Sequence, residues 1–178
     1  MADDPETGKK RINEGKREQM EKETLTFEEI LEKKGYLVYT NVGYSMLPLL
    51  RQRRDIIEIH RKDPAVRCKR YDVVLYKYGG KYILHRVVKV RPQDYVICGD
   101  HNRFCEYGIT DREILGVLTR VIRDGKSIYP TDWRYRLYVH LWCDCLPARF
   151  GMFRLRDYAA AGIRKIKRLL KREKRSEV

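Results

Sequence analysis

A series of short β-branched and aromatic segments between residues 36 and 129 constrains this 178-residue sequence more than any other feature. Val, Ile and Tyr favour the pleated, half-buried backbone of strands. Turn-forming pairs separate the segments, including Asp63-Pro64, Gly79-Gly80 and Gly99-Asp100. The strands expected from this pattern are residues 37–40, 55–59, 72–76, 82–84, 87–90, 95–97 and 116–122. Many short strands with tight turns predict a mainly β fold, in which an antiparallel sheet curls or partly closes.

A short helix is expected before the first strand. Residues 26–29, Thr-Phe-Glu-Glu, form a capping box, in which the Thr hydroxyl and the Glu carboxylate each satisfy a free backbone amide. Phe27, Ile30 and Leu31 then share one face of the helix, and Gly35 is well placed to end it.

The sequence divides into three parts. Residues 1–23 carry mixed charge and almost no large apolar side chains, which predicts a disordered tail. Residues 24–130 are expected to form the folded domain. Residues 131–178 hold 13 Lys and Arg against 5 Asp and Glu, a large share of the net charge of +14, and predict a basic, amphipathic, helical extension.

Several classes of protein are disfavoured by the sequence. It contains no apolar run of the ~18–20 residues that a transmembrane helix needs, and residues 1–22 are too polar for a signal peptide. A cytoplasmic or peripheral membrane location is therefore expected. The five cysteines include no CxxC pair, and Cys143, Cys145, His140 and Asp144 match no common zinc spacing. We expect no metal or organic cofactor.

Three segments hold residues that could carry chemistry. Residues 43–48, Gly-Tyr-Ser-Met-Leu-Pro, follow a predicted strand and place Ser45 on a bend. His85 lies within a predicted strand, between apolar residues. Residues 96–102 end in an acidic turn that contains Asp100. Each segment alone has an ordinary structural interpretation: a strand-end loop, a half-buried histidine and a hydrogen-bonded turn.

In this order and spacing, the segments closely resemble signal peptidase I, and most of all its archaeal and endoplasmic-reticulum type, whose general base is histidine. Four blocks carry the resemblance: residues 43–48, 69–76, 85–88 and 99–102. It covers roughly residues 36–128 and implies the fold shared by signal peptidases and LexA-type peptidases. The strand at residues 116–121 also resembles the one that follows the acidic turn in that family.

The resemblance implies a serine endopeptidase that cleaves extended, signal-peptide-like substrates. Ser45 would be the acylated nucleophile, and His85 would take its proton. Asp100 corresponds to the acid of the family's Gly-Asp-Asn-Asn motif, and Glu106 falls at the spacing of its later aspartate. These two acids rank equally as the partner of His85, with Asp111 behind them. The chemistry is consistent, because a serine hydroxyl needs an adjacent base and the base needs an orienting acid.

The sequence departs from the family at two points. Gly43 stands where the family often has a serine that helps to bind the oxyanion. Either backbone N–H groups at Gly43, Tyr44 and Met46 serve instead, or turnover is slow. Residues 1–22 are polar and charged, so we do not expect them to form the family's usual N-terminal membrane anchor.

The basic C-terminal part suggests a partner. On a helix, Ile163, Ile166 and Leu170 share one side, and Lys and Arg fill much of the rest. This pattern is typical either of a solvated helix packed on the domain or of an interfacial helix on an anionic membrane surface. Nucleic-acid binding is disfavoured, because no recognised motif accompanies the charge.

Three hypotheses follow from the sequence. The first is a bacterial or archaeal signal-peptidase-like serine endopeptidase acting on a peptide or preprotein. The second is a LexA-type self-cleaving regulator, although such enzymes use lysine where this sequence has His85. The third is a catalytically inert, basic membrane-surface module that keeps a peptidase-like fold.

Overall fold

The computed structural model describes residues 25–145, 150–156, 158, 159 and 161–164. The predicted disordered tail at residues 1–23 lies outside these residues. So does the part of the predicted basic helix that follows residue 164.

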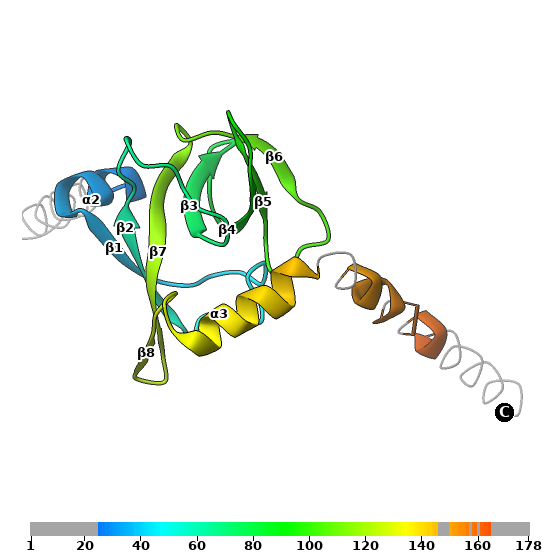
Figure 1. Ribbon diagram of the computed structural model, residues 1–178. Helices are drawn as coiled ribbons and strands as arrows, with labels where there is room; N and C mark the ends of the chain where they lie inside the picture. The colour runs from blue at the N-terminus through cyan, green and yellow to red at the C-terminus, as the bar shows by residue number, and fades with distance from the viewer. Residues whose placement is uncertain (1–24, 146–149, 157, 160, 165–178) are drawn as a thin grey trace, which may run out of the picture.

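The described chain is mainly β, as predicted, with one antiparallel sheet of eight strands that is not closed. The strands are β1 (Tyr36–Thr40), β2 (Ile56–Arg61), β3 (Val73–Tyr78), β4 (Lys81–Val90), β5 (Tyr95–Cys98), β6 (Glu106–Ile109), β7 (Ile114–Arg123) and β8 (Lys126–Ile128). Their order is β1-β2-β7-β3-β4-β5-β6, and β8 pairs with β7. Figure 1 shows the sheet curling around its interior.

Strand β6 lies outside the predicted set. Its sequence, Glu-Tyr-Gly-Ile, lacks a β-branched run, and Gly108 takes a positive φ of 78°. Pairing with β5 forms this strand, because Ile109 lies opposite Tyr95 and Glu106 lies opposite Ile97. Tertiary pairing has overridden weak local propensity here.

The predicted N-terminal helix is confirmed as α2 (Phe27–Lys34). Both halves of the capping box form: the Glu29 amide donates to the Thr26 hydroxyl, and the Thr26 amide donates to the Glu29 carboxylate. Gly35 ends the helix with a φ of 77°, the left-handed conformation that glycine adopts easily. Leu31 of this helix belongs to the buried core.

The largest hydrophobic core joins α2, the sheet and a C-terminal helix. The helix comprises α3 (Trp133–Val139) and a π-helical continuation, η1 (His140–Asp144). Figure 1 shows α3 lying across one end of the curled sheet. Its Tyr135, Val139 and Cys143 are buried in the same core as Met46 and Leu75. The main core therefore includes side chains beyond residue 130, as the alternative of a helix packed on the domain implies.

Candidate active site

The predicted nucleophile, Ser45, lies on a bend between β1 and β2 and is half-buried. Gly43 opens the bend with a φ of 128°, which only glycine adopts without strain. Met46 is 2% exposed and packs in the main core, whereas Tyr44 is 64% exposed. Burial of Met46 therefore fixes the bend to the domain, with Ser45 between one buried and one exposed neighbour.

The bend is tied to the turn that follows β5. The His101 amide donates a hydrogen bond to the Ser45 carbonyl at 2.7 Å. Gly99 is packed so tightly that a Cβ there would lie 2.7 Å from that same carbonyl oxygen and 2.8 Å from Cγ of Asn102. The chain can approach this closely only because residue 99 has no side chain. The structure therefore brings two of the predicted segments, residues 43–48 and 99–102, into direct contact.

The predicted base, His85, lies in β4 and is 5% exposed. Its Nδ1 lies 3.3 Å from Oε1 of Glu106 and 3.2 Å from the hydroxyl of Tyr76. The Tyr76 hydroxyl also donates to Oε2 of Glu106. Histidine, glutamate and tyrosine, from β4, β6 and β3, thus form one hydrogen-bonded cluster.

These contacts favour one tautomer of His85. We assign the ring proton to Nδ1, because the Tyr76 hydroxyl gives its own proton to Glu106 and can therefore only accept a hydrogen bond from Nδ1. Oε1 of Glu106 lies 3.3 Å from the same nitrogen. The other nitrogen, Nε2, then carries the lone pair and lies 3.5 Å from Nδ2 of Asn102. Since Asn102 also packs against Gly99 beside the Ser45 carbonyl, Nε2 faces the side of the cluster where the Ser45 bend lies.

Burial controls the charges at this cluster. It lowers the pKa of His85 from 6.5 to about 4, against the weaker opposing influence of the Asp100 carboxylate. Burial also raises the pKa of Glu106. The imidazole is therefore neutral near pH 7, which is the form that can accept a proton.

The lowered pKa of His85 predicts how stability varies with pH. Between pH 6.5 and about 4 the unfolded chain protonates this ring and the folded chain does not, so the free energy of unfolding falls as the pH falls. We expect the wild type to lose up to about 3 kcal/mol over this window relative to His85→Gln. Urea unfolding of both proteins at a series of pH values measures the difference. Parallel stability curves would contradict the buried, neutral ring.

Asp100, ranked equal to Glu106 from the sequence, has a different partner. Its two carboxylate oxygens accept hydrogen bonds from Nε and Nη2 of Arg86 at 2.9 and 2.7 Å, and the Tyr138 hydroxyl donates to it at 2.9 Å. Arg86 is 0% exposed and Asp100 is 1% exposed. The Asp100 charge reaches His85 only at a distance, whereas Glu106 contacts the ring. Asp100 is thus paired with Arg86 in the interior, whereas Glu106 lies beside Nδ1 of His85.

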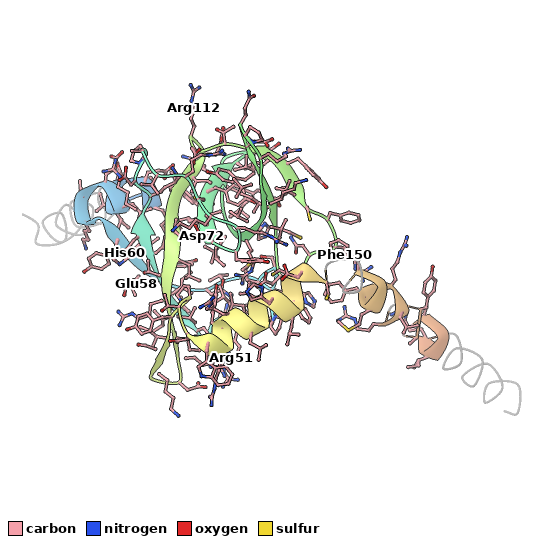
Figure 2. The ribbon with its side chains drawn as sticks, in the orientation of Figure 1. Arg51, Glu58, His60, Asp72, Arg112 and Phe150 are labelled. Atoms are coloured by element: carbon pink, nitrogen blue, oxygen red, sulfur yellow. The ribbon has the colours of Figure 1, made fainter. Side chains whose placement is uncertain are left out.

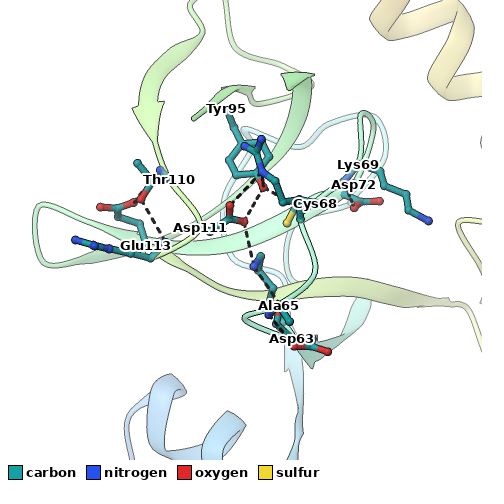
Figure 3. A network of polar contacts seen from close by, with 12 residues as sticks. Asp63, Ala65, Cys68, Lys69, Asp72, Tyr95, Thr110, Asp111 and Glu113 are labelled. Atoms are coloured by element: carbon teal, nitrogen blue, oxygen red, sulfur yellow. Dashed lines mark hydrogen bonds and ion pairs between the residues drawn. The ribbon is translucent and has the colours of Figure 1, made fainter. Parts of the chain in front are cut away.

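Asp111, the third acid considered, lies in a separate network (Figure 3). Its carboxylate accepts a hydrogen bond from the Tyr95 hydroxyl at 2.6 Å and forms ion pairs with Lys62 at 3.0 Å and Arg67 at 3.3 Å. Three partners account for this carboxylate, so Asp111 ties the residue 62–67 loop to the sheet.

Ser45 is one of the residues that line a groove of about 500 Å³. Its walls are mostly apolar and include Phe27 of α2, Tyr39 of β1 and Leu84 of β4. Among the residues that the structure describes, no hydrogen bond joins the Ser45 hydroxyl to the His85 ring. The Asn102 amide lies next to Nε2 instead.

Other candidates from the sequence do not join this site. His60 lies on β2 beside Glu58, at 2.8 Å, in a different region of the sheet (Figure 2). Nδ1 of His140 pairs with Asp144 at 2.9 Å, and the described residues contain no cluster of His, Cys, Asp and Glu suited to a metal ion. None of the described helices combines the length and the apolar character required to cross a bilayer.

Two residues of the cluster, Tyr76 and Asn102, were not singled out from the sequence. Tyr76 has a detectable signal: the Gly79-Gly80 turn sets Val74 opposite His85, which makes Tyr76 its diagonal neighbour on the same face. Asn102 has none, because its place depends on the fold of the turn.

No family model matches the chain, and no curated protein is similar enough to count as a relative.

Proposed function

We propose that this protein is a signal-peptidase-like serine endopeptidase with Ser45 as nucleophile, His85 as general base and Glu106 as the acid that orients the base. The observation that carries the proposal is the meeting of three distant segments. The Ser45 bend contacts the Gly99–Asn102 turn, and that turn and Glu106 contact opposite nitrogens of His85.

In this proposal, the Ser45 hydroxyl attacks a peptide carbonyl and gives its proton to Nε2 of His85. The new C–O bond forms an acyl-enzyme, and His85 returns the proton to the departing amine. Glu106 stabilises the transient imidazolium through Nδ1. Water then attacks the ester and gives a proton to Nε2 of His85. His85 passes this proton to the Ser45 oxygen as the acid product leaves. The Asn102 amide must release Nε2 before the hydroxyl can use it.

The groove supports an extended peptide as substrate. Among the described strands, residues 81–84 of β4 pair with β3 only, since pairing with β5 begins at Arg86. Strand β1 pairs with β2 only. Both free edges border the groove, because Tyr39 and residues 80–84 line it. An extended peptide can hydrogen-bond to such an edge while its apolar side chains enter the groove.

In this proposal, backbone N–H groups bind the oxyanion that forms when Ser45 attacks. Gly43 carries no hydroxyl, and the backbone N–H groups at Gly43, Tyr44 and Met46 are the candidates closest to Ser45 in sequence. A bend fixed by a buried Met46 is suited to holding such amides in place.

Reaction with a fluorophosphonate, which phosphorylates activated serine hydroxyls, tests the proposal. The sequence has three serines, Ser45, Ser127 and Ser176, so the modified position identifies the site. We expect one adduct, on Ser45, and none in His85→Ala. An unmodified protein, or an adduct on Ser127 or Ser176, would favour the inert membrane-surface module instead.

A substitution at Gly99 tests whether the turn positions the bend. Gly99→Ala would force its new Cβ against the Ser45 carbonyl, at 2.7 Å, and move the nucleophile. Because misplacement by about 1 Å can cost ~100-fold, we expect kcat/KM for peptide cleavage to fall by about that factor. Gly151→Ala is the matched control, since its Cβ would meet nothing within 4 Å. Full activity in Gly99→Ala would contradict the positioning role.

A further inference from the structure

The outer face of α3 and η1 carries a row of large apolar side chains. Trp133 is 69% exposed, Leu137 is 51% exposed and Leu141 is 67% exposed. The opposite row, formed by Tyr135, Val139 and Cys143, is buried in the main core. Each row repeats at every fourth residue, so the helix presents two apolar faces, one covered by the sheet and one not.

Helix geometry places these rows on opposite sides. The exposed and buried rows are offset by two residues, which is about 200° around the axis. Burial of one row therefore forces the other outward, whatever the packing of the individual side chains. An apolar face of this kind is a recognised mark of an interaction surface.

Cations flank the exposed row. Arg134 and Arg136 are both exposed. Around the helix axis, Arg134 lies about 100° from Trp133 in one direction and Arg136 about 60° in the other, so they stand on opposite sides of the exposed row. The Arg134 guanidinium lies over the Trp133 ring, 5.3 Å from its centroid. An apolar centre with arginines on both sides is the pattern of a helix lying in a membrane interface.

One carboxylate shares this face, and it is already paired. Asp144 accepts hydrogen bonds from Arg70 at 2.8 Å, from His140 at 2.9 Å and from the Tyr71 hydroxyl. Those contacts lower the pKa of Asp144, first through Tyr71 and then through His140. A second carboxylate, Asp132, stands at the N-cap of α3 and accepts a hydrogen bond from the Tyr129 amide at 2.7 Å. Within α3 itself, Arg134 and Arg136 are the charged residues, so the helix is positive.

The helical residues that follow have the same character. Leu155 is 71% exposed and Tyr158 is 75% exposed, with the exposed Arg154 and Arg156 beside them. The alternation of exposed apolar and cationic side chains thus continues past α3, in the part of the chain that Figure 1 shows leaving the body of the sheet.

We infer that α3 and η1 form a docking surface for an anionic lipid bilayer, with Trp133, Leu137 and Leu141 inserted among the acyl chains and Arg134 and Arg136 on the headgroups. The charge decides between a bilayer and a protein partner. Arginines on both flanks match a continuous anionic surface, and each basic residue near such a surface adds to binding. This inference does not depend on the proposed peptidase activity.

Flotation with vesicles tests the inference, using the full chain and two vesicle compositions, pure phosphatidylcholine and an equal mixture of phosphatidylcholine and phosphatidylglycerol. We expect binding to the mixed vesicles and at least tenfold weaker binding of the variant Leu137→Glu/Leu141→Glu. Val66→Glu is the control, because Val66 is 54% exposed and lies in a loop outside α3. It should bind like the wild type.

Fluorescence supplies a second readout at the helix itself. Trp133 emission should shift to the blue with mixed vesicles, and Trp133→Phe should lose this shift while retaining the fold. Equal vesicle binding by wild type and the Leu137→Glu/Leu141→Glu variant would overturn the inference and place binding elsewhere in the basic sequence. Dimerisation without vesicle binding, abolished by the same variant, would overturn it in favour of a second copy of the chain.

Discussion

Ser45→Ala and His85→Ala should each lower kcat/KM for cleavage of a signal-peptide-like substrate by at least about 10⁴-fold. Losses of this order follow when the nucleophile or its base is removed from a serine peptidase, because the two act as one unit. The double variant should be no slower than either single variant, for the same reason. A quenched fluorescent peptide, assayed under kcat/KM conditions, measures all three.

The matched control is Ser127→Ala, since Ser127 is exposed on β8. It should retain wild-type kcat/KM. Ser45 is half-buried on a loop, so its alanine variant should also keep the wild-type unfolding midpoint, which separates lost chemistry from lost fold. Either single variant cleaving at the wild-type rate would refute the proposed roles.

Asp100→Asn should destabilise the fold by about 3–5 kcal/mol. The substitution removes the charge that neutralises Arg86, whose side chain is 0% exposed, and an unpaired buried charge costs roughly this much. Burial disfavours the charged guanidinium, and the Asp100 carboxylate opposes this and holds the pKa of Arg86 well above its usual value. When Asp100 is lost the guanidinium still keeps its proton at pH 7, because arginine does not deprotonate in proteins, and it is then buried without its counter-charge. Urea unfolding at pH 7 measures the change.

Glu106→Gln is the contrasting variant. Its side chain is 35% exposed and contacts His85 rather than a buried arginine, so we expect a small change in stability. The amide can no longer stabilise a protonated imidazole, so we expect a large fall in kcat with a smaller change in KM. The reverse pattern, with activity lost in Asp100→Asn at unchanged stability, would restore Asp100 as the orienting acid.

The sequence predicted the parts of this fold that depend on local patterns. The capping box at residues 26–29 starts helix α2 through hydrogen bonds within the box itself, so it needs no other part of the chain. The Gly79-Gly80 turn likewise sets the register of β3 on β4, with Tyr78 opposite Lys81 and Val74 opposite His85. Ser45 and His85, by contrast, were chosen from the resemblance of their segments to signal peptidase I, and their catalytic roles stay predictions.

The choice between the acids depended on contacts that no local pattern encodes. His85 and Arg86 are neighbours on β4, so their side chains point to opposite faces of the sheet. Asp100 belongs to the Arg86 face and Glu106 to the His85 face. The sequence does not show that Arg86 is buried, and without that fact the two acids remain equivalent.

The packing of α3 was left open for a similar reason. The basic, aromatic-rich sequence fitted either a helix packed on the domain or an interfacial helix, and Tyr135, Val139 and Cys143 belong to the main core. Their spacing is helical, yet Trp133, Leu137 and Leu141 repeat with the same spacing. Because both rows are apolar and have the same spacing, the sequence alone does not show which row is buried against the sheet.

Trapping of the acyl-enzyme tests the central claim most directly. The protein would be mixed with an activated ester of a signal-peptide-like acyl chain, quenched in acid and analysed by intact mass and peptide mapping. The account predicts a mass increase equal to the acyl group, located on Ser45 in the wild type and lacking in His85→Ala. An acyl group on another residue, or unchanged mass while the ester is hydrolysed, would contradict it.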